Sequence, residues 1–255
     1  MATPLSLTER LLKSLGVRIL KKGSSRKFLT LPKDFEEEHV CIYRQVEPFT
    51  MTRPDRVYAL IEAVKYLVRS DIEGDFVECG VWRGGSIMAM ALTLNKLAAH
   101  RNLHLFDTFA GMTAPTEEDV SVSGEKATST FARKQLSEGG SNWVRSTLKE
   151  VKENVFSSGY DRGRFHFHEG RVEDTLPGKA PERIALLRLD TDFYESTRHE
   201  LNTLYPRLVS GGVLILDDYG HWQGSRKAVD DYIREQELSI LLNRIDFAGR
   251  IAVKP

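Results

Sequence analysis

Aspartates that follow apolar segments are the side chains of this chain best suited to chemistry. Asp107 ends one such segment, Asp190 and Asp192 follow residues 184–189, and Asp217 and Asp218 follow residues 212–216. If these segments are neighbouring parallel strands, their carboxyl ends meet in one crevice at the edge of a sheet. Crowded carboxylates repel one another, so a cation is their natural partner, and an all-oxygen ligand set suits Mg²⁺.

Each of these aspartates also has a simpler interpretation. Asp192 and Glu195 have the spacing of a capping box, so Asp192 could only cap a helix. Asp217 and Asp218 could form an Asx turn, and Asp107 could be a turn residue. The convergence of all five at the ligand-binding end of one sheet favours the chemical interpretation.

Residues 75–86 predict a strand, a tight turn and the start of a helix. The turn contains Gly80, Gly84 and Gly85. Glycine lets a ligand approach the backbone, and the helix start offers free N–H groups, so we expect Gly80→Val to abolish ligand binding. The dinucleotide pattern G-x-G-x-x-G fails at Trp82, which disfavours a dehydrogenase. The stretch resembles motif I of class I methyltransferases, which bind S-adenosylmethionine.

The remaining pattern predicts an α/β fold with a doubly wound, mostly parallel sheet. Expected helices span residues 56–69, 141–157, 195–208 and 226–236, and expected strands include residues 103–107, 164–169, 239–245 and 249–254. We expect an irregular segment at residues 32–54 and a lid insert at about residues 112–140, because long polar loops usually cover a site. The predicted division is an N-terminal helical extension and cap segment (1–54) followed by a catalytic domain (55–255).

The composition limits the classes of partner. Equal numbers of basic and acidic residues, 36 of each, argue against a nucleic-acid partner. Two distant cysteines favour a reducing, cytoplasmic location, and no apolar run approaches the length of a membrane span. Residues 4–27 alternate leucines with basic residues, which predicts an amphipathic helix packed on the domain or on another subunit. Membrane-surface binding is the less favoured alternative, and we expect a homo-oligomer.

Four motifs together resemble the macrocin O-methyltransferase family, whose members modify sugars of natural products. They are residues 77–86 (VECGVWRGGS), 106–111 (FDTFAG), 189–194 (LDTDFY) and 216–220 (LDDYG), and the resemblance runs from about residue 35 to the C-terminus. It implies a Rossmann-like class I methyltransferase with seven strands. It also implies transfer of a methyl group from S-adenosylmethionine to a deoxysugar hydroxyl with the help of Mg²⁺, and a small-molecule glycoside as substrate.

The resemblance assigns roles to individual residues. By position, Asp190, Asp217 and Asp218 are the expected metal ligands. The expected cofactor-binding residues are Glu78, Gly80, Arg83, Ser86, Asp107, Thr108, Gly170 and Arg171. Catechol O-methyltransferases, which are similar in arrangement, have a catalytic lysine where this chain has Phe193, so we assign the general base to Asp192. Two alternatives stay open: a non-sugar diol acceptor such as a catechol, and a non-catalytic nucleotide-binding protein on the same fold.

Overall fold

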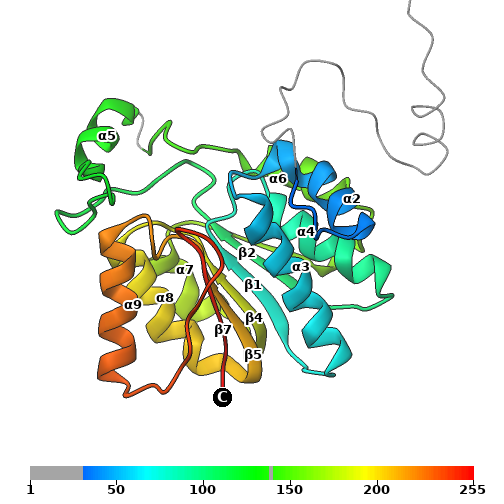
Figure 1. Cartoon of the computed structure of the whole chain (residues 1–255). Coiled ribbons are helices and arrows are strands. Elements are labelled where there is room, and N and C mark those ends of the chain that lie inside the picture. The colour runs from blue at the N-terminus through cyan, green and yellow to red at the C-terminus, as the bar shows by residue number, and fades with distance from the viewer. Residues whose placement is uncertain (1–30, 138–139) are drawn as a thin grey trace, which may run out of the picture. The chain divides into compact units, whose positions relative to one another are not determined.

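The computed structural model describes residues 31–137 and 140–255, and Leu31–Pro255 forms one compact unit (Figure 1). The predicted amphipathic helix at residues 4–27 lies outside the described residues. The helices of eight or more residues are α2 (Glu37–Val46), α3 (Pro54–Arg69), α4 (Gly85–Lys96), α5 (Ala127–Lys134), α6 (Leu148–Phe156), α7 (Val172–Lys179), α8 (Tyr194–Leu204) and α9 (Gln223–Glu235). The strands are β1 (Asp75–Cys79), β2 (Leu103–Asp107), β3 (Phe165–Glu169), β4 (Ile184–Leu189), β5 (Leu208–Leu216), β6 (Asn243–Arg244) and β7 (Arg250–Val253).

The strands form a seven-stranded sheet in the order β3-β2-β1-β4-β5-β7-β6. Strands β1 to β5 pair in parallel, whereas β7 runs antiparallel to both β5 and β6. The chain reverses its direction of winding between β1 and β4, which is where open α/β sheets bind ligands. The predicted doubly wound, mostly parallel sheet is confirmed.

Helices cover both faces of the sheet, as Figure 1 shows. Helices α2, α3, α4 and α6 pack together on one face, and α7, α8 and α9 on the other. Strand β4 is buried at every position because both of its faces are covered. The sheet is therefore a rigid support for the residues at its carboxyl edge.

The prediction that residues 32–54 are irregular is wrong. Helix α2 occupies Glu37–Val46, and it packs against α3 and α4. Acidic residues at its start, Glu37 and Glu38, favour a helix N-terminus, and the apolar residues Ile42, Tyr43 and Val46 are buried. The prolines of this segment lie outside the helix: Pro32 precedes it, Pro48 follows it, and Pro54 begins α3.

The predicted helix at residues 141–157 begins later, at Leu148. The Thr147 side chain caps this helix by accepting a hydrogen bond from the Glu150 backbone N–H, and Val144 has a left-handed backbone with φ of 53°. Two helices were not predicted by the sequence pattern. They are α5, which residues 127–134 form within the insert, and α7, which residues 172–179 form after β3.

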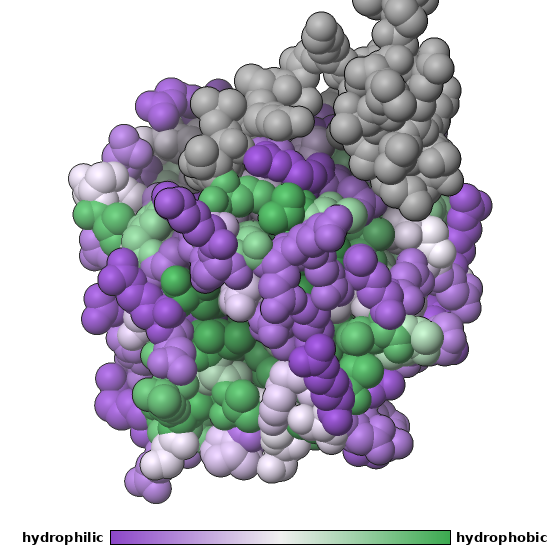
Figure 2. All heavy atoms as spheres, turned by 45° about the vertical axis from the view of Figure 1, so that its right-hand side comes forward, coloured by the Kyte–Doolittle hydropathy of each residue, from purple (hydrophilic) through white to green (hydrophobic). Residues whose placement is uncertain are grey.

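The surface carries both hydrophobic and hydrophilic residues. On the face shown in Figure 2, hydrophobic residues lie in several patches between hydrophilic ones. Among the described residues, no helix is long and apolar enough to cross a lipid bilayer.

Candidate active site

A cavity of about 490 Å³ lies at the carboxyl ends of the parallel strands. Its walls include seven of the eight predicted cofactor-binding residues, namely Glu78, Gly80, Ser86, Asp107, Thr108, Gly170 and Arg171, and all four predicted metal and base aspartates, Asp190, Asp192, Asp217 and Asp218. Arg83 is not part of the wall. Its side chain donates to Glu150 (2.9 Å) and to the Pro48 carbonyl oxygen (3.1 Å), so we leave Arg83 out of the cofactor site.

The glycine turn is held in shape by Asp107 at the end of β2. One carboxylate oxygen accepts hydrogen bonds from the backbone N–H groups of Val81 (2.7 Å) and Trp82 (3.0 Å). The other oxygen accepts from the Phe109 N–H at 2.7 Å. A carboxylate has about four acceptor positions, so these bonds leave capacity for a ligand hydroxyl. Helix α4 begins directly after the turn, and no side chain of the described residues caps it.

The expected reason for glycine at position 80 is wrong. Gly80 has a left-handed backbone with φ of 81°, and a Cβ atom there would lie 2.0 Å from the carbonyl oxygen of Asp190. The absent side chain therefore makes room for the end of β4, and not for a ligand. Gly80→Val would disturb the acidic site itself, so it is not a clean test of cofactor binding.

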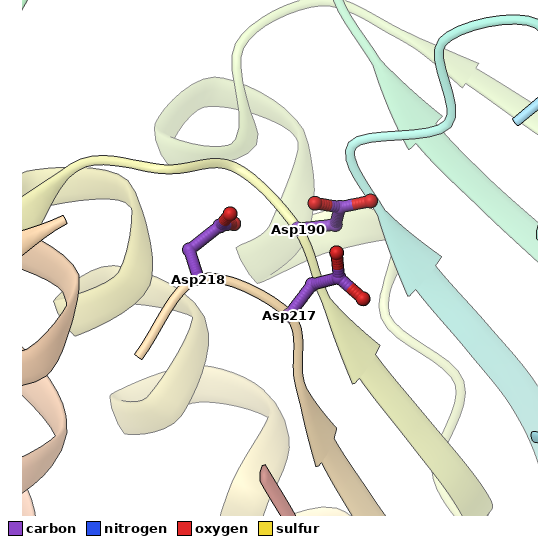
Figure 3. A group of neighbouring side chains, drawn as sticks. All are labelled: Asp190, Asp217 and Asp218. Carbon is purple, nitrogen blue, oxygen red and sulfur yellow. The ribbon is translucent and has the colours of Figure 1, made fainter. Parts of the chain in front are cut away.

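The three predicted metal ligands lie together. Asp190 follows β4, and Asp217 and Asp218 follow the neighbouring strand β5 (Figure 3). Each offers a carboxylate oxygen, and these oxygens lie within 4.8 Å of one another. Figure 3 shows the carboxylates of Asp190 and Asp217 side by side above the strand ends, as expected for a shared cation.

Two arginines already contact this cluster, Arg188, which is buried, and Arg56, which is partly buried. One terminal nitrogen of Arg188 donates to Asp190 (2.8 Å) and to Glu78, and the other donates to Asp217 (2.6 Å). Arg56 donates to the second carboxylate oxygen of Asp217 and forms an ion pair with Asp246 at 3.1 Å. These two cations offset part of the negative charge of the cluster.

The remaining charge is not balanced. Burial, together with the carboxylates of the cluster, raises the pKa of Asp190 and of Asp218 well above its usual range. Burial and then the Asp190 carboxylate raise the pKa of Asp192 to about 7. A divalent cation would offset the repulsion between these carboxylates, and three converging carboxylate oxygens match the donor set of Mg²⁺. The residues present therefore fit the metal that the sequence predicted.

Asp192 is neither a strand residue nor a helix cap. Strand β4 ends at Leu189, and Asp192 has a left-handed backbone with φ of 69°, so the strand geometry does not extend from Asp190 to Asp192. The Asp192 N–H donates to Asp218 at 3.3 Å. Helix α8 has Phe193 at its N-cap, and its first N–H, that of Tyr194, donates to Asp119. The capping-box interpretation of Asp192 is therefore wrong.

Aromatic and insert residues form the other side of the cavity. Trp143, Phe193 and Trp222 make edge-to-face contacts with centroid distances of 5.6–6.1 Å, and both tryptophans line the cavity. The insert contributes Ser121, Glu125, Lys126 and Thr130. An apolar wall with a few polar groups is typical of a small-molecule site and excludes water from it.

Two charged residues that shape this site, Arg188 and Asp119, were not predicted from the sequence. Arg188 is the single charged residue within the buried strand β4, and that position was the signal that could have identified it. Asp119 lies in a polar insert with other acidic residues, and nothing in the local sequence distinguishes it from them.

Comparison with known proteins points to one family. Residues 19–252 match the family model described as macrocin-O-methyltransferase (TylF). The chain is 35% identical over 205 residues to the 8-demethyl-8-(2,3-dimethoxy-alpha-L-rhamnosyl)-tetracenomycin-C 4'-O-methyltransferase of Streptomyces olivaceus, an alignment that covers 78% of this chain and 73% of that protein. It is 31% identical to the mycinamicin III 3''-O-methyltransferase of Micromonospora griseorubida, with 78% of this chain and 76% of the relative covered.

A solved structure has the same architecture. The O-methyltransferase NovP superimposes with a TM-score of 0.71 at 28% sequence identity, over 81% of this chain and 82% of NovP. The predicted class I methyltransferase fold is therefore confirmed by comparison as well as by the order of the strands.

Proposed function

Because this chain belongs to the macrocin O-methyltransferase family and is an S-adenosylmethionine-dependent O-methyltransferase, we propose that it methylates a deoxysugar hydroxyl of a glycosylated natural product with the help of Mg²⁺. The observation that carries the proposal is the carboxylate cluster of Asp190, Asp217 and Asp218 beside an aromatic wall in one cavity. The name of the Streptomyces olivaceus relative includes a rhamnosyl group, which supports a glycoside acceptor.

The cofactor side of the cavity is the glycine turn with the residues around it. The backbone N–H groups at the start of α4 and the remaining acceptor position of Asp107 would bind the polar parts of S-adenosylmethionine. Thr108, Gly170 and Arg171 would enclose the rest of this cofactor, and Glu78 and Ser86 lie at the base of the turn. The cofactor itself supplies the electrophilic methyl group.

The acidic side activates the acceptor. Asp190, Asp217 and Asp218 would hold Mg²⁺, which supplies the Lewis acidity that makes an alcohol proton easier to remove. Asp192 accepts that proton on its carboxylate, and Arg188 and Arg56 hold the Asp217 carboxylate in place beside it. The aromatic wall keeps bulk water away from the reacting groups. A homo-oligomeric state, a cytoplasmic location and a domain boundary near residue 54 stay predictions from the sequence.

A turnover screen tests the acceptor class and the metal together. Purified protein is incubated with S-adenosylmethionine and a panel of glycosylated natural products, their matched aglycones and a simple catechol, with Mg²⁺ or with EDTA. We expect S-adenosylhomocysteine to form with glycosides and Mg²⁺ only. Turnover of the aglycones or the catechol would replace the sugar acceptor by the alternative diol, and full turnover in EDTA would remove Mg²⁺ from the proposal.

A matched pair of variants tests the base. Asp192→Asn should lower turnover by about 10²–10⁴-fold while leaving the binding of S-adenosylhomocysteine and Mg²⁺ intact. Glu195→Gln, an exposed carboxylate three residues later, is the control and should retain activity. Full turnover of Asp192→Asn would show that another group, such as His221, takes the proton. Loss of Mg²⁺ binding in that variant would exchange the roles of Asp190 and Asp192.

A further inference from the structure

Asp119 is a buried carboxylate in the insert, and its partners lie in two separate parts of the chain. Its side chain is 1% exposed. One carboxylate oxygen accepts a hydrogen bond from the Tyr194 N–H at 2.8 Å. The other accepts from the N–H (2.7 Å) and the hydroxyl (3.0 Å) of Thr116 within the insert. The buried Asp119 carboxylate therefore forms a long-range hydrogen bond between the insert and the core.

The Asp119 carboxylate lies at the starts of two helices. Tyr194 is the first residue of α8, and a Cβ atom on Gly224, the second residue of α9, would lie 2.1 Å from the Asp119 oxygen. The N-cap residues of these helices, Phe193 and Trp222, make no side-chain cap. Helix N-termini leave N–H groups unpaired and carry partial positive charge, so a carboxylate there satisfies both.

The backbone next to Asp119 joins the same region. Residues 120–126 form a small hairpin, since Val120 and Lys126 pair in antiparallel fashion. The Val122 N–H donates to the His221 carbonyl oxygen (2.9 Å), and the Gln223 N–H donates to the Val120 carbonyl oxygen (2.8 Å). In Figure 1 the insert lies above the upper end of α9. The hairpin thus adjoins the segment that follows Asp218.

We propose that Asp119 is a positioning residue that fastens the 116–127 segment over the acceptor side of the cavity. This inference rests on the proposed function, because it assigns the acceptor to the wall that Ser121, Glu125 and Lys126 form. Through the Tyr194 N–H, the same carboxylate holds the start of α8 and thereby the loop that carries Asp192. Gly224 is required because any side chain there would displace the carboxylate.

Asp119 acts on the acceptor side and has no contact with the glycine turn. Its removal should therefore change the KM for the acceptor and leave the Kd for S-adenosylhomocysteine nearly unchanged, whereas a general loss of structure would change both. Asp119→Ala should raise the KM for the acceptor by about 10–100-fold, the effect of a lost charged hydrogen bond, while the Kd for S-adenosylhomocysteine changes by less than about twofold. Gly224→Ala should act in the same direction, because its Cβ atom would displace the Asp119 carboxylate without removing it.

Hydrogen exchange in the absence of any acceptor measures the fastening directly. In Asp119→Ala, peptides covering residues 116–127 and the Tyr194 amide should exchange about 10–100-fold faster, while the strands of the sheet keep their protection. Glu118→Ala, an exposed neighbouring carboxylate, is the control and should exchange as the wild type does. Asp119→Asn retains an oxygen for Tyr194 but presents an NH₂ group to the Thr116 N–H, so it should lie between the two.

The outcomes separate the two proposals. Faster local exchange together with a raised acceptor KM supports the positioning role. Unchanged exchange in both Asp119→Ala and Gly224→Ala overturns it, as does loss of cofactor binding and acceptor binding in equal measure in Asp119→Asn. If the wild-type protein methylates none of the glycosides, the proposed acceptor fails, and the exchange data still decide whether Asp119 fastens the segment.

Discussion

Removal of the Arg188 charge tests whether this buried arginine holds the acidic site together. Arg188 is 2% exposed and donates to Glu78, Asp190 and Asp217, which come from three neighbouring strand ends. Arg188→Met keeps an unbranched apolar stem of similar length but leaves three carboxylates without their shared cation. Removing one partner of a buried ion pair costs about 3–5 kcal/mol of unfolding free energy. For a chain of this size, that corresponds to a fall in Tm of about 6–20 °C.

The assay is urea unfolding followed by circular dichroism at neutral pH, with Arg183→Met as the matched control. Arg183 also pairs with a glutamate, Glu73, but both side chains are exposed, so this change should cost less than about 1 kcal/mol. Equal losses in the two variants would refute the reasoning that burial makes the Arg188 contacts strong. A loss below about 1 kcal/mol for Arg188→Met would show that the carboxylates are neutralised by protonation instead.

Three further results are expected. Gly80→Ala should lower the unfolding free energy by about 2–4 kcal/mol in urea titration, because its Cβ atom would meet the Asp190 carbonyl oxygen at a positive φ, and an unchanged midpoint would contradict the contact. Burial, followed by His104, His166 and Lys179, lowers the pKa of His168 to about 4, so the folded state binds fewer protons than the unfolded state between pH 6.5 and 4. The stabilisation from neutral His168 is therefore complete above pH 6.5 and is lost as pH falls toward 4. In His168→Gln, the fall in unfolding free energy between pH 6.5 and 4 should be smaller than in the wild type by about 1–3 kcal/mol. Parallel pH profiles for the two proteins would exclude this role of His168. Limited proteolysis should cut within residues 112–137 first, and more slowly with S-adenosylhomocysteine and an acceptor bound, and equal rates with and without ligands would argue against a lid.

The sequence predicted the sheet well because its strands have simple patterns. Residues 184–189 and 212–216 are nearly continuous apolar runs, which suit strands covered on both faces. Helix α2 was not predicted because its flanking prolines, Pro32 and Pro48, are typical of a loop, although the apolar residues between them have helical spacing. The start of α6 was predicted too early because the apolar residues at 143 and 144 fit a helical spacing. The N-cap residue Thr147 sets the true boundary.

For the site, strand ends could be predicted, and the contacts between distant segments could not. The convergence of Asp190, Asp217 and Asp218 follows from the topology of a parallel sheet. The contact of Asp119 with Tyr194 joins residues 75 positions apart, and no local pattern specifies it. The orientation of Asp192 depends on its left-handed backbone, and the sequence LDTDFY does not specify that conformation.

The way in which the hairpin of residues 120–126 is attached has a consequence for how this enzyme could acquire new acceptors. The bonds that join it to residues 221–223 use only the backbone of the hairpin, including the bond from the Gln223 side-chain amide to the Ser121 carbonyl oxygen (3.2 Å), so they do not depend on which side chains the hairpin carries. The side chains of Ser121, Glu125 and Lys126, in contrast, line the cavity. Substitutions at these three positions can therefore change the shape and charge of the acceptor wall while the attachment persists. Specificity and anchoring are encoded in different atoms of the same short segment, which makes it a suitable target for directed evolution of acceptor choice.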